Sequence, residues 1–255
     1  MNVDINIELV KGCVNKRCPS YGKNCRPEIP SYMTEKVLYK ILVEIAQNLD
    51  RPELYLYGRA EAVSHPRLEK MTEIVRGFFP KSRLCLSTDI NMVNMVGPAP
   101  YSLFDKVTIT YKEPSLMYCE FDFDFLSSVA EMGHMFITRK VDREFLTRLD
   151  NYLDDIPPDH RVVIAPLHDI SFSCGDTETG RPGLELDEFA RNLLGEEMEP
   201  SEGSGVRAFY DINGKLNTCL FNSSSFSTLK EHLAGQQLHP CKSCRMKTRI
   251  LQVGR

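Results

Sequence analysis

Apolar residues in this chain occur in two alternating patterns. Short apolar runs of strand composition are separated by longer segments in which apolar residues recur at helical spacing. The predicted strands are 5–10, 54–57, 83–87, 106–111, 135–141 and 161–167. The predicted helices are 34–48, 65–78, 121–132 and 142–155. This alternation predicts an α/β fold with a parallel sheet covered by helices, and the short apolar runs favour strands buried on both faces.

The alternation stops near residue 168, which is too early for a closed eight-fold barrel of about 250 residues. We therefore expect a partial (β/α)6 TIM-like barrel over 1–168. Residues 169–255 have a different pattern and predict a small C-terminal α+β unit that carries cysteines. In it, Asn213-Gly214 lies between apolar runs and predicts a hairpin.

Composition and charge exclude several classes of protein. The chain has 255 residues, of which 42% are hydrophobic and 26% charged, as in globular proteins. A net charge of −4 argues against nucleic-acid binding. No apolar run is long enough to span a membrane, and the first residues lack the pattern of a secretory signal. We therefore expect a cytoplasmic protein with no membrane partner.

The expected compartment determines how the cysteines are interpreted, because clustered cysteines in a reducing environment indicate metal ligands rather than disulfides. Two of the nine cysteines, Cys85 and Cys119, have no cysteine neighbours and are predicted to be core thiols. The remaining seven are the candidate ligands: Cys13, Cys18, Cys25, Cys174, Cys219, Cys241 and Cys244.

Cys13, Cys18 and Cys25 follow the first predicted strand. Three thiolates leave one iron of a 4Fe–4S cluster open to a small molecule, which is the arrangement of an exchangeable-ligand cluster. Two alternatives remain open, namely a zinc site with a fourth ligand elsewhere and three buried free thiols.

Three motifs in order resemble the radical S-adenosylmethionine (SAM) enzymes over about residues 5–165. The three-cysteine segment comes first, followed by LYLYGRAEAVSHP and LSTDIN. The family's Gly-Gly-Glu-Pro motif corresponds here to residues 58–62, with Glu61 retained and alanine at positions 60 and 62; His65-Pro66 follows in step. The cysteine spacing is Cx4Cx6C, whereas the family usually has CxxxCxxC.

This resemblance implies a 4Fe–4S cluster on the three cysteines and SAM bound at its open iron. It further implies cofactor binding by Gly58, Glu61, Thr88, Asp89 and Arg139. Arg139 and His168, both near the carboxyl rim of the barrel, are the candidate catalytic residues. From the residues alone, Glu61 can equally be an ordinary acid before a helix, and Arg139 can pair with another acid.

The C-terminal unit resembles the twitch/SPASM-like auxiliary domain of some radical SAM enzymes. Its GxxxxC motif ends at Cys219, and its CxxC motif is Cys241-Lys-Ser-Cys244. Together with Cys174 these cysteines would hold a second 4Fe–4S cluster, although four thiolates can also hold tetrahedral zinc.

The function that the resemblance implies is a radical SAM oxidoreductase. Reductive cleavage of SAM would give a 5′-deoxyadenosyl radical that abstracts a hydrogen from the substrate, and the auxiliary cluster would accept the remaining electron. The expected partners are a small-molecule or peptide substrate and an electron donor such as flavodoxin or ferredoxin. The alternative is a non-catalytic, metal-stabilised relative of this scaffold that holds zinc or a single cluster and serves interaction.

Overall fold

A computed structural model describes most of the N-terminal half of the chain and several elements of the rest. The described residues are 3–12, 29–58, 60–97, 99–112, 129, 131–138, 156, 160–166, 206–219, 222–225, 228–238 and 251–253.

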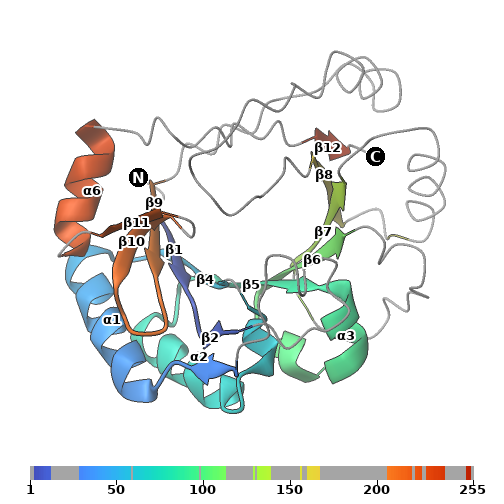
Figure 1. The fold of residues 1–255 in the computed structure, drawn as a ribbon, viewed down its shortest axis with the longest axis horizontal. Helices are drawn as coiled ribbons and strands as arrows, with labels where there is room; N and C mark the ends of the chain where they lie inside the picture. Colours follow the sequence, from blue (N-terminus) through green and yellow to red (C-terminus); the bar gives the residue numbers. More distant parts are fainter. Residues whose placement is uncertain are drawn as a thin grey trace.

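A curved sheet of ten strands forms the centre of the molecule (Figure 1). Seven of the strands are parallel and the sheet does not close into a barrel, which confirms the predicted partial TIM-like fold. Six parallel strands follow one another in chain order: β1 (Val3–Ile7), β4 (Glu53–Leu56), β5 (Leu84–Asp89), β6 (Lys106–Lys112), β7 (Glu131–Thr138) and β8 (Arg161–Pro166).

The seventh parallel strand comes from the C-terminal part of the chain. Strand β9 (Val206–Tyr210) pairs with β1, and β10 (Leu216–Cys219) and β11 (Asn222–Ser225) continue the sheet antiparallel beyond it. At the opposite edge, β12 (Leu251–Val253) pairs antiparallel with β8. Strands from both predicted domains thus take part in the same ten-stranded sheet, while the boundary at 168/169 stays a prediction.

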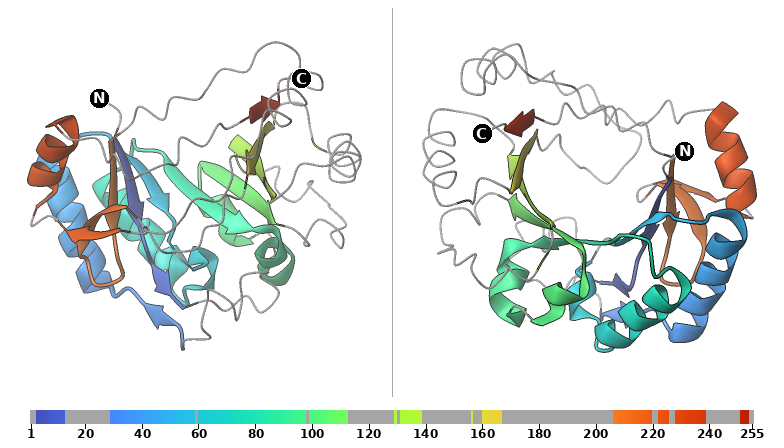
Figure 2. Two further views of the ribbon diagram at one scale, coloured as in Figure 1. Left: turned by 45° about the horizontal axis from the view of Figure 1, so that its top comes forward. Right: turned by 180° about the vertical axis from the view of Figure 1, so that it is seen from behind.

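Helices cover the convex side of the sheet (Figure 2). They are α1 (Glu35–Asn48), α2 (Leu68–Phe78) and α3 (Ile90–Val96), and α6 (Leu229–Leu238) lies beside α1. Helix α1 begins where the sequence predicts it, because the Thr34 side chain accepts a hydrogen bond from the Val37 amide. None of the helices in the described ranges is long and apolar enough to cross a membrane.

The two faces of the sheet differ in character. On the convex face, Ile5, Leu54, Leu84 and Val107 are at most 1% exposed and join the side chains of α1 and α2 in the core. On the concave face, the alternate positions are polar. They include Asp4, Asn6, Glu53, Tyr55, Ser87, Lys106, Thr108 and Glu131, all partly exposed. The prediction of strands buried on both faces is therefore wrong for β1 and β4, whose alternate residues are partly exposed, and holds for β5, in which only Ser87 is partly exposed.

A single carboxylate links the C-terminal elements to α1. Glu44 accepts hydrogen bonds from the Tyr210 hydroxyl at 3.2 Å and from the Leu229 amide, at the start of α6, at 2.6 Å. Because burial raises the pKa of Tyr210, with a further contribution from the Glu44 charge, the Tyr210 hydroxyl stays protonated and donates this bond.

Two local expectations need correction. The predicted helix 121–132 is wrong at its last two residues, because β7 already begins at Glu131, where Met132 and His134 alternate into the buried convex face. The Asn213-Gly214 hairpin is confirmed, but its turn is longer than two residues. The amides of Gly214 and Asp211 bond to Asp211 O and Lys215 O respectively, with Gly214 at a φ of 80°.

Candidate functional site

The candidate site lies at the carboxyl ends of β1, β4 and β5, which are neighbours in the sheet. In open parallel sheets the loops at this edge build the binding site. The predicted cofactor residues follow these strands: Gly58 and Glu61 come after β4, and Thr88 and Asp89 end β5.

Glu61 joins two of these strand ends. Its carboxylate accepts a hydrogen bond from the Thr88 hydroxyl at 2.8 Å and from the Asp89 amide at 3.2 Å. The backbone after Glu61 forms a short 3-10 turn (Ala62–Ser64), and the Ser64 hydroxyl donates to the Glu61 carbonyl at 2.7 Å. Residues predicted from two separate motifs are thus brought into direct contact.

Gly58 is glycine because Glu8 fills the space beside it. A Cβ on residue 58 would lie 2.5 Å from Glu8 Cγ and 2.8 Å from Glu8 Cβ, closer than real atoms approach. Glu8 follows β1 and is fully buried. The sequence analysis missed Glu8, although its place at the end of the alternating run VDINIE put it on the polar face of β1.

Tyr101 is a second residue that the motifs did not indicate. It lies in a 3-10 turn (Ala99–Leu103) and is fully buried. Burial raises its pKa, the neighbouring Thr88 hydroxyl opposes the rise, and the nearby Glu61 charge raises it further. The phenol thus stays neutral beside Thr88 and Glu61.

Asp89 has a structural role that the sequence could have indicated. Its side chain caps α3 by accepting from the Asn91 amide at 3.0 Å and from the Asn91 side chain at 2.7 Å. Asp followed by apolar residues at helical spacing is a helix-start signal, yet helix α3 was not predicted.

These side chains fit the methionine part of SAM chemically. A carboxylate oxygen can accept more than one hydrogen bond, so a carboxylate such as that of Glu61 is a group that can bind an ammonium while it also accepts from Thr88 and Asp89. The carbonyl of Gly58 lies on the same edge of the sheet. Acceptors of this kind suit the methionine ammonium, since hydrogen bonds between a cation and a carboxylate are the stronger ones.

The three-cysteine segment starts and ends at the same edge. Strands β2 (Val10–Lys11) and β3 (Ser31–Tyr32) pair antiparallel immediately before and after it. Gly12, with a φ of 96° that favours glycine, turns the chain out of β2 directly before Cys13. A trio of thiolates is a suitable donor set for a 4Fe–4S cluster with one open iron.

Most of the other predicted site residues lie outside the described residues. This holds for Cys13, Cys18, Cys25, Cys174, Cys241 and Cys244, for Arg139 and His168, and for Cys119, which was predicted to be a core thiol. Cys219 ends β10, on the hairpin where the sequence placed it. Cys85 is a buried free thiol, as predicted. Among the described residues, no three His, Cys, Asp or Glu side chains form a metal-binding group.

Comparison with known proteins finds similarity in structure and not in sequence. No family model matches the chain, and no curated protein matches it. Two solved structures of BtrN, a radical SAM enzyme, are similar in fold. The crystal structure of BtrN in complex with AdoMet and 2-DOIA aligns with a TM-score of 0.50 at 12% identity, over 95% of this chain and 84% of that chain.

The second structure is selenomethionine BtrN in an open conformation. It aligns with a TM-score of 0.45 at 11% identity, over 95% of this chain and 82% of that one. At such low identity the first alignment shows the fold alone, which is the partial TIM-like barrel of radical SAM enzymes.

Proposed function

We propose that this protein is a radical SAM enzyme, and specifically an oxidoreductase. The observation that carries the proposal is the contact of Glu61 with Thr88 and Asp89 at the carboxyl edge of an open barrel. Glu61 comes from one sequence motif and Thr88 and Asp89 from another, and this edge is also where the three-cysteine segment begins and ends. Similarity to the fold of BtrN supports the same reading.

Within this proposal, each described residue has a definite task. Glu61 and the Gly58 carbonyl accept hydrogen bonds from the methionine ammonium of SAM. Thr88 and the Asp89 amide hold the Glu61 carboxylate in position, so that it does not have to be ordered when SAM binds. Glu8 fills the space beside Gly58 and keeps water out of it.

The cofactors supply the chemistry that side chains do not. Cys13, Cys18 and Cys25 would hold a 4Fe–4S cluster, which would supply the one-electron reduction of SAM to methionine and a radical able to remove a hydrogen atom from the substrate. To become an oxidised product, the substrate must also lose one electron and one proton. Cys174, Cys219, Cys241 and Cys244 would hold a second cluster that could accept the electron, and His168 would accept the proton. Arg139 would pair with the carboxylate of SAM, because its guanidinium is already protonated and cannot take up a proton.

The polar concave face bears on the substrate. Asn6, Tyr55, Ser87 and Thr108 offer amide and hydroxyl groups there. A small polar molecule would find hydrogen-bond partners on this face. BtrN, whose fold is similar, was crystallised in complex with AdoMet and 2-DOIA. A peptide remains the second substrate class, and a flavodoxin or ferredoxin is the proposed electron donor in the cytoplasm.

Anaerobic reconstitution tests the proposal directly. The purified chain is loaded with iron and sulfide, analysed for iron, sulfide and zinc, and then incubated with SAM and dithionite. We expect about eight irons per chain, as two 4Fe–4S clusters require, and formation of 5′-deoxyadenosine. Zinc without iron, or iron without 5′-deoxyadenosine, would favour the non-catalytic scaffold.

A cysteine variant tests the oxidoreductase assignment separately. Replacing Cys241 and Cys244 by alanine should preserve SAM cleavage at the first cluster and lower oxidised product per 5′-deoxyadenosine. Normalising to 5′-deoxyadenosine corrects for lost folding, because metal ligands also stabilise their domain. An unchanged ratio would mean that the C-terminal metal is structural.

A further inference from the structure

His65 connects the base of the three-cysteine segment to the turn that carries Glu61. It follows the 3-10 turn after Glu61, and its ring reaches Met33, which comes directly after β3. His65 is 6% exposed and Met33 is 2% exposed. The ring of Tyr32, in β3, stands edge-on to the His65 ring with centroids 5.4 Å apart.

The hydrogen bonds of His65 determine which ring nitrogen carries the proton. Nε2 lies 3.1 Å from the Met33 carbonyl, which can only accept, so Nε2 carries the hydrogen. Nδ1 lies 3.1 Å from the Arg67 amide, which can only donate, so Nδ1 is bare. Only the neutral ring with its hydrogen on Nε2 makes both bonds.

The charge and burial around the ring maintain this neutral form. Burial lowers the pKa of His65, the Met33 carbonyl opposes that effect, and the Arg67 charge lowers it further. The Arg67 guanidinium itself forms an ion pair with Glu35 at the start of α1. The ring therefore stays uncharged at neutral pH.

The chain on the other side of the contact is fixed to the sheet. The Met33 amide donates to the Leu9 carbonyl at 2.8 Å, directly beside the pairing of β2 with β3. The paired strands β2 and β3, together with Met33, thus form the base of segment 13–28. The His65 ring donates a hydrogen bond to the Met33 carbonyl and so connects this base to the turn after Glu61.

We propose that His65 is a positioning residue that fixes the base of the three-cysteine segment against the Glu61 turn, and thereby sets the cluster at the right place for the SAM methionine. This inference rests on the proposed function. The two hydrogen bonds of His65 have different roles. The bond to Met33 positions the segment, and the bond to Arg67 stabilises the local turn before α2.

Two substitutions separate these two roles. In His65→Gln, the side-chain amide nitrogen lies near the place of Nε2 and can donate to Met33, but nothing accepts from the Arg67 amide. In His65→Asn, the side-chain oxygen lies near the place of Nδ1 and accepts from the Arg67 amide in an Asx turn, but the side chain is too short to reach Met33. Each variant keeps one bond, so each serves as the folding control for the other.

The experiment uses the full chain, reconstituted anaerobically. The measurements are the rate at which excess chelator removes the cluster absorbance, and the change in the spin-resonance signal of the reduced cluster when SAM is added. Hydrogen exchange at the Met33 amide, measured without iron, gives a readout that does not depend on the cluster. Loss of one buried hydrogen bond corresponds to about a fivefold change in such rates.

We expect His65→Gln to behave like the wild type in all three measurements. We expect His65→Asn to lose its cluster about fivefold faster, to exchange the Met33 amide faster and to respond weakly to SAM. If the two variants behave alike, or if only His65→Gln is impaired, His65 acts in the local turn alone and the inference is wrong. If the wild-type chain takes up no iron at all, the proposed function itself fails.

Discussion

The convex and concave faces of the sheet are made from alternate residues of the same strands, yet they have opposite characters. Along β1, Ile5 is fully buried in the core, while Asn6, its neighbour, is partly exposed on the concave face. The convex face contributes apolar burial and therefore most of the stability. The concave face and its carboxyl edge carry the polar groups. Because successive side chains of a strand point to opposite faces, each strand contributes to stability on its convex face and to the candidate site on its concave face.

The largest expected effect tests this separation within one strand. Ile5→Ala should destabilise the fold by about 2–5 kcal/mol, because it removes buried methyl groups and leaves a cavity. Asn6→Ala should cost less than about 1 kcal/mol, since its side-chain amide makes only a long 3.5 Å hydrogen bond to the Ala208 carbonyl. Denaturant unfolding of the two variants and the wild type measures both values. Equal losses would show that the concave face is also a packed core.

The second prediction compares the two ends of the concave side. Glu61→Gln keeps the shape but removes the charge that binds an ammonium, so SAM affinity should fall by one to two decades, or about 1.5–3 kcal/mol. Glu53→Gln, at the amino end of β4, is the matched control and should leave SAM affinity unchanged. Calorimetric titration of the reconstituted protein with SAM measures both. Equal affinities for the wild type and Glu61→Gln would remove Glu61 from the site.

Sequence reasoning succeeded where one periodicity or one motif acts locally. The strands of the barrel and helix α1 follow from apolar spacing and from the Thr34 cap. Gly58, Glu61, Thr88 and Asp89 were indicated by their order along the chain, and the parallel sheet places them on one edge. Their roles as ligands remain predictions.

What the sequence did not reveal depends on contacts between distant segments. Strand β9 lies about two hundred residues after β1 in the sequence, and no local pattern predicts that the two strands pair. Glu8 and Tyr101 are polar residues whose burial depends on Gly58 and on the end of β5. The polar concave face was misread because a short strand such as 54–57 alternates Leu with Tyr, which counts as apolar in composition but is only partly buried here.

The convex face has its own polar exception, which pH can test. His134 in β7 is 1% exposed. Its Nδ1 lies 2.7 Å from the Tyr111 hydroxyl, and its Nε2 lies 2.9 Å from Nδ1 of His160. Burial, with a smaller effect from His160, lowers the pKa of His134 to about 3. The unfolded chain takes up this proton near pH 6.5, so the stability that His134 contributes is complete above that pH and is lost as the pH falls towards 3.

This loss has a limiting slope of about 1.4 kcal/mol per pH unit for one proton. His65, whose pKa is also lowered, changes stability in the same direction, so the wild type must be compared with His134→Asn. We expect the variant to be less stable at neutral pH but to lose less stability between about pH 6.5 and 5, where few carboxylates titrate. Denaturant unfolding at several pH values measures the slopes. If the unfolding free energies of the wild type and His134→Asn change with pH at the same slope, His134 is not the group whose lowered pKa causes the loss of stability.

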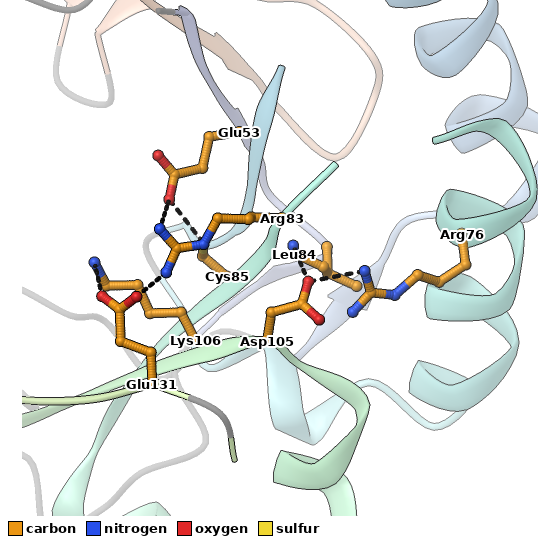
Figure 3. A network of polar contacts seen from close by, with 8 residues as sticks. All are labelled: Glu53, Arg76, Arg83, Leu84, Cys85, Asp105, Lys106 and Glu131. Atoms are coloured by element: carbon orange, nitrogen blue, oxygen red, sulfur yellow. Dashed lines mark hydrogen bonds and ion pairs between the residues drawn. The ribbon is translucent and has the colours of Figure 1, made fainter. Parts of the chain in front are cut away.

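The smallest expected effect concerns the ion network at the amino end of the concave face (Figure 3). Arg83 pairs with Glu131 and lies 3.8 Å from Glu53, while Lys106 bonds to Glu131 at 2.8 Å. The thiol of Cys85 donates to Glu53 at 3.3 Å, and burial, aided by the Glu53 charge, raises its pKa to about 12. A protonated, buried thiol is inert, so it adds no reactivity to this end of the sheet.

Arg83→Met should therefore cost less than about 1 kcal/mol, because the Arg83 side chain is 48% exposed and its charges are largely solvated. The loss should vanish in about 1 M salt, where screening extends over only about 3 Å. Lys40→Met, an exposed lysine on α1, is the control for the general effect of removing a charge. Unfolding measured at low and high salt decides the matter. If Arg83→Met loses stability in high salt as well, and Lys40→Met does not, the polar residues of the concave face also stabilise the fold. Their role would then not be limited to the candidate site.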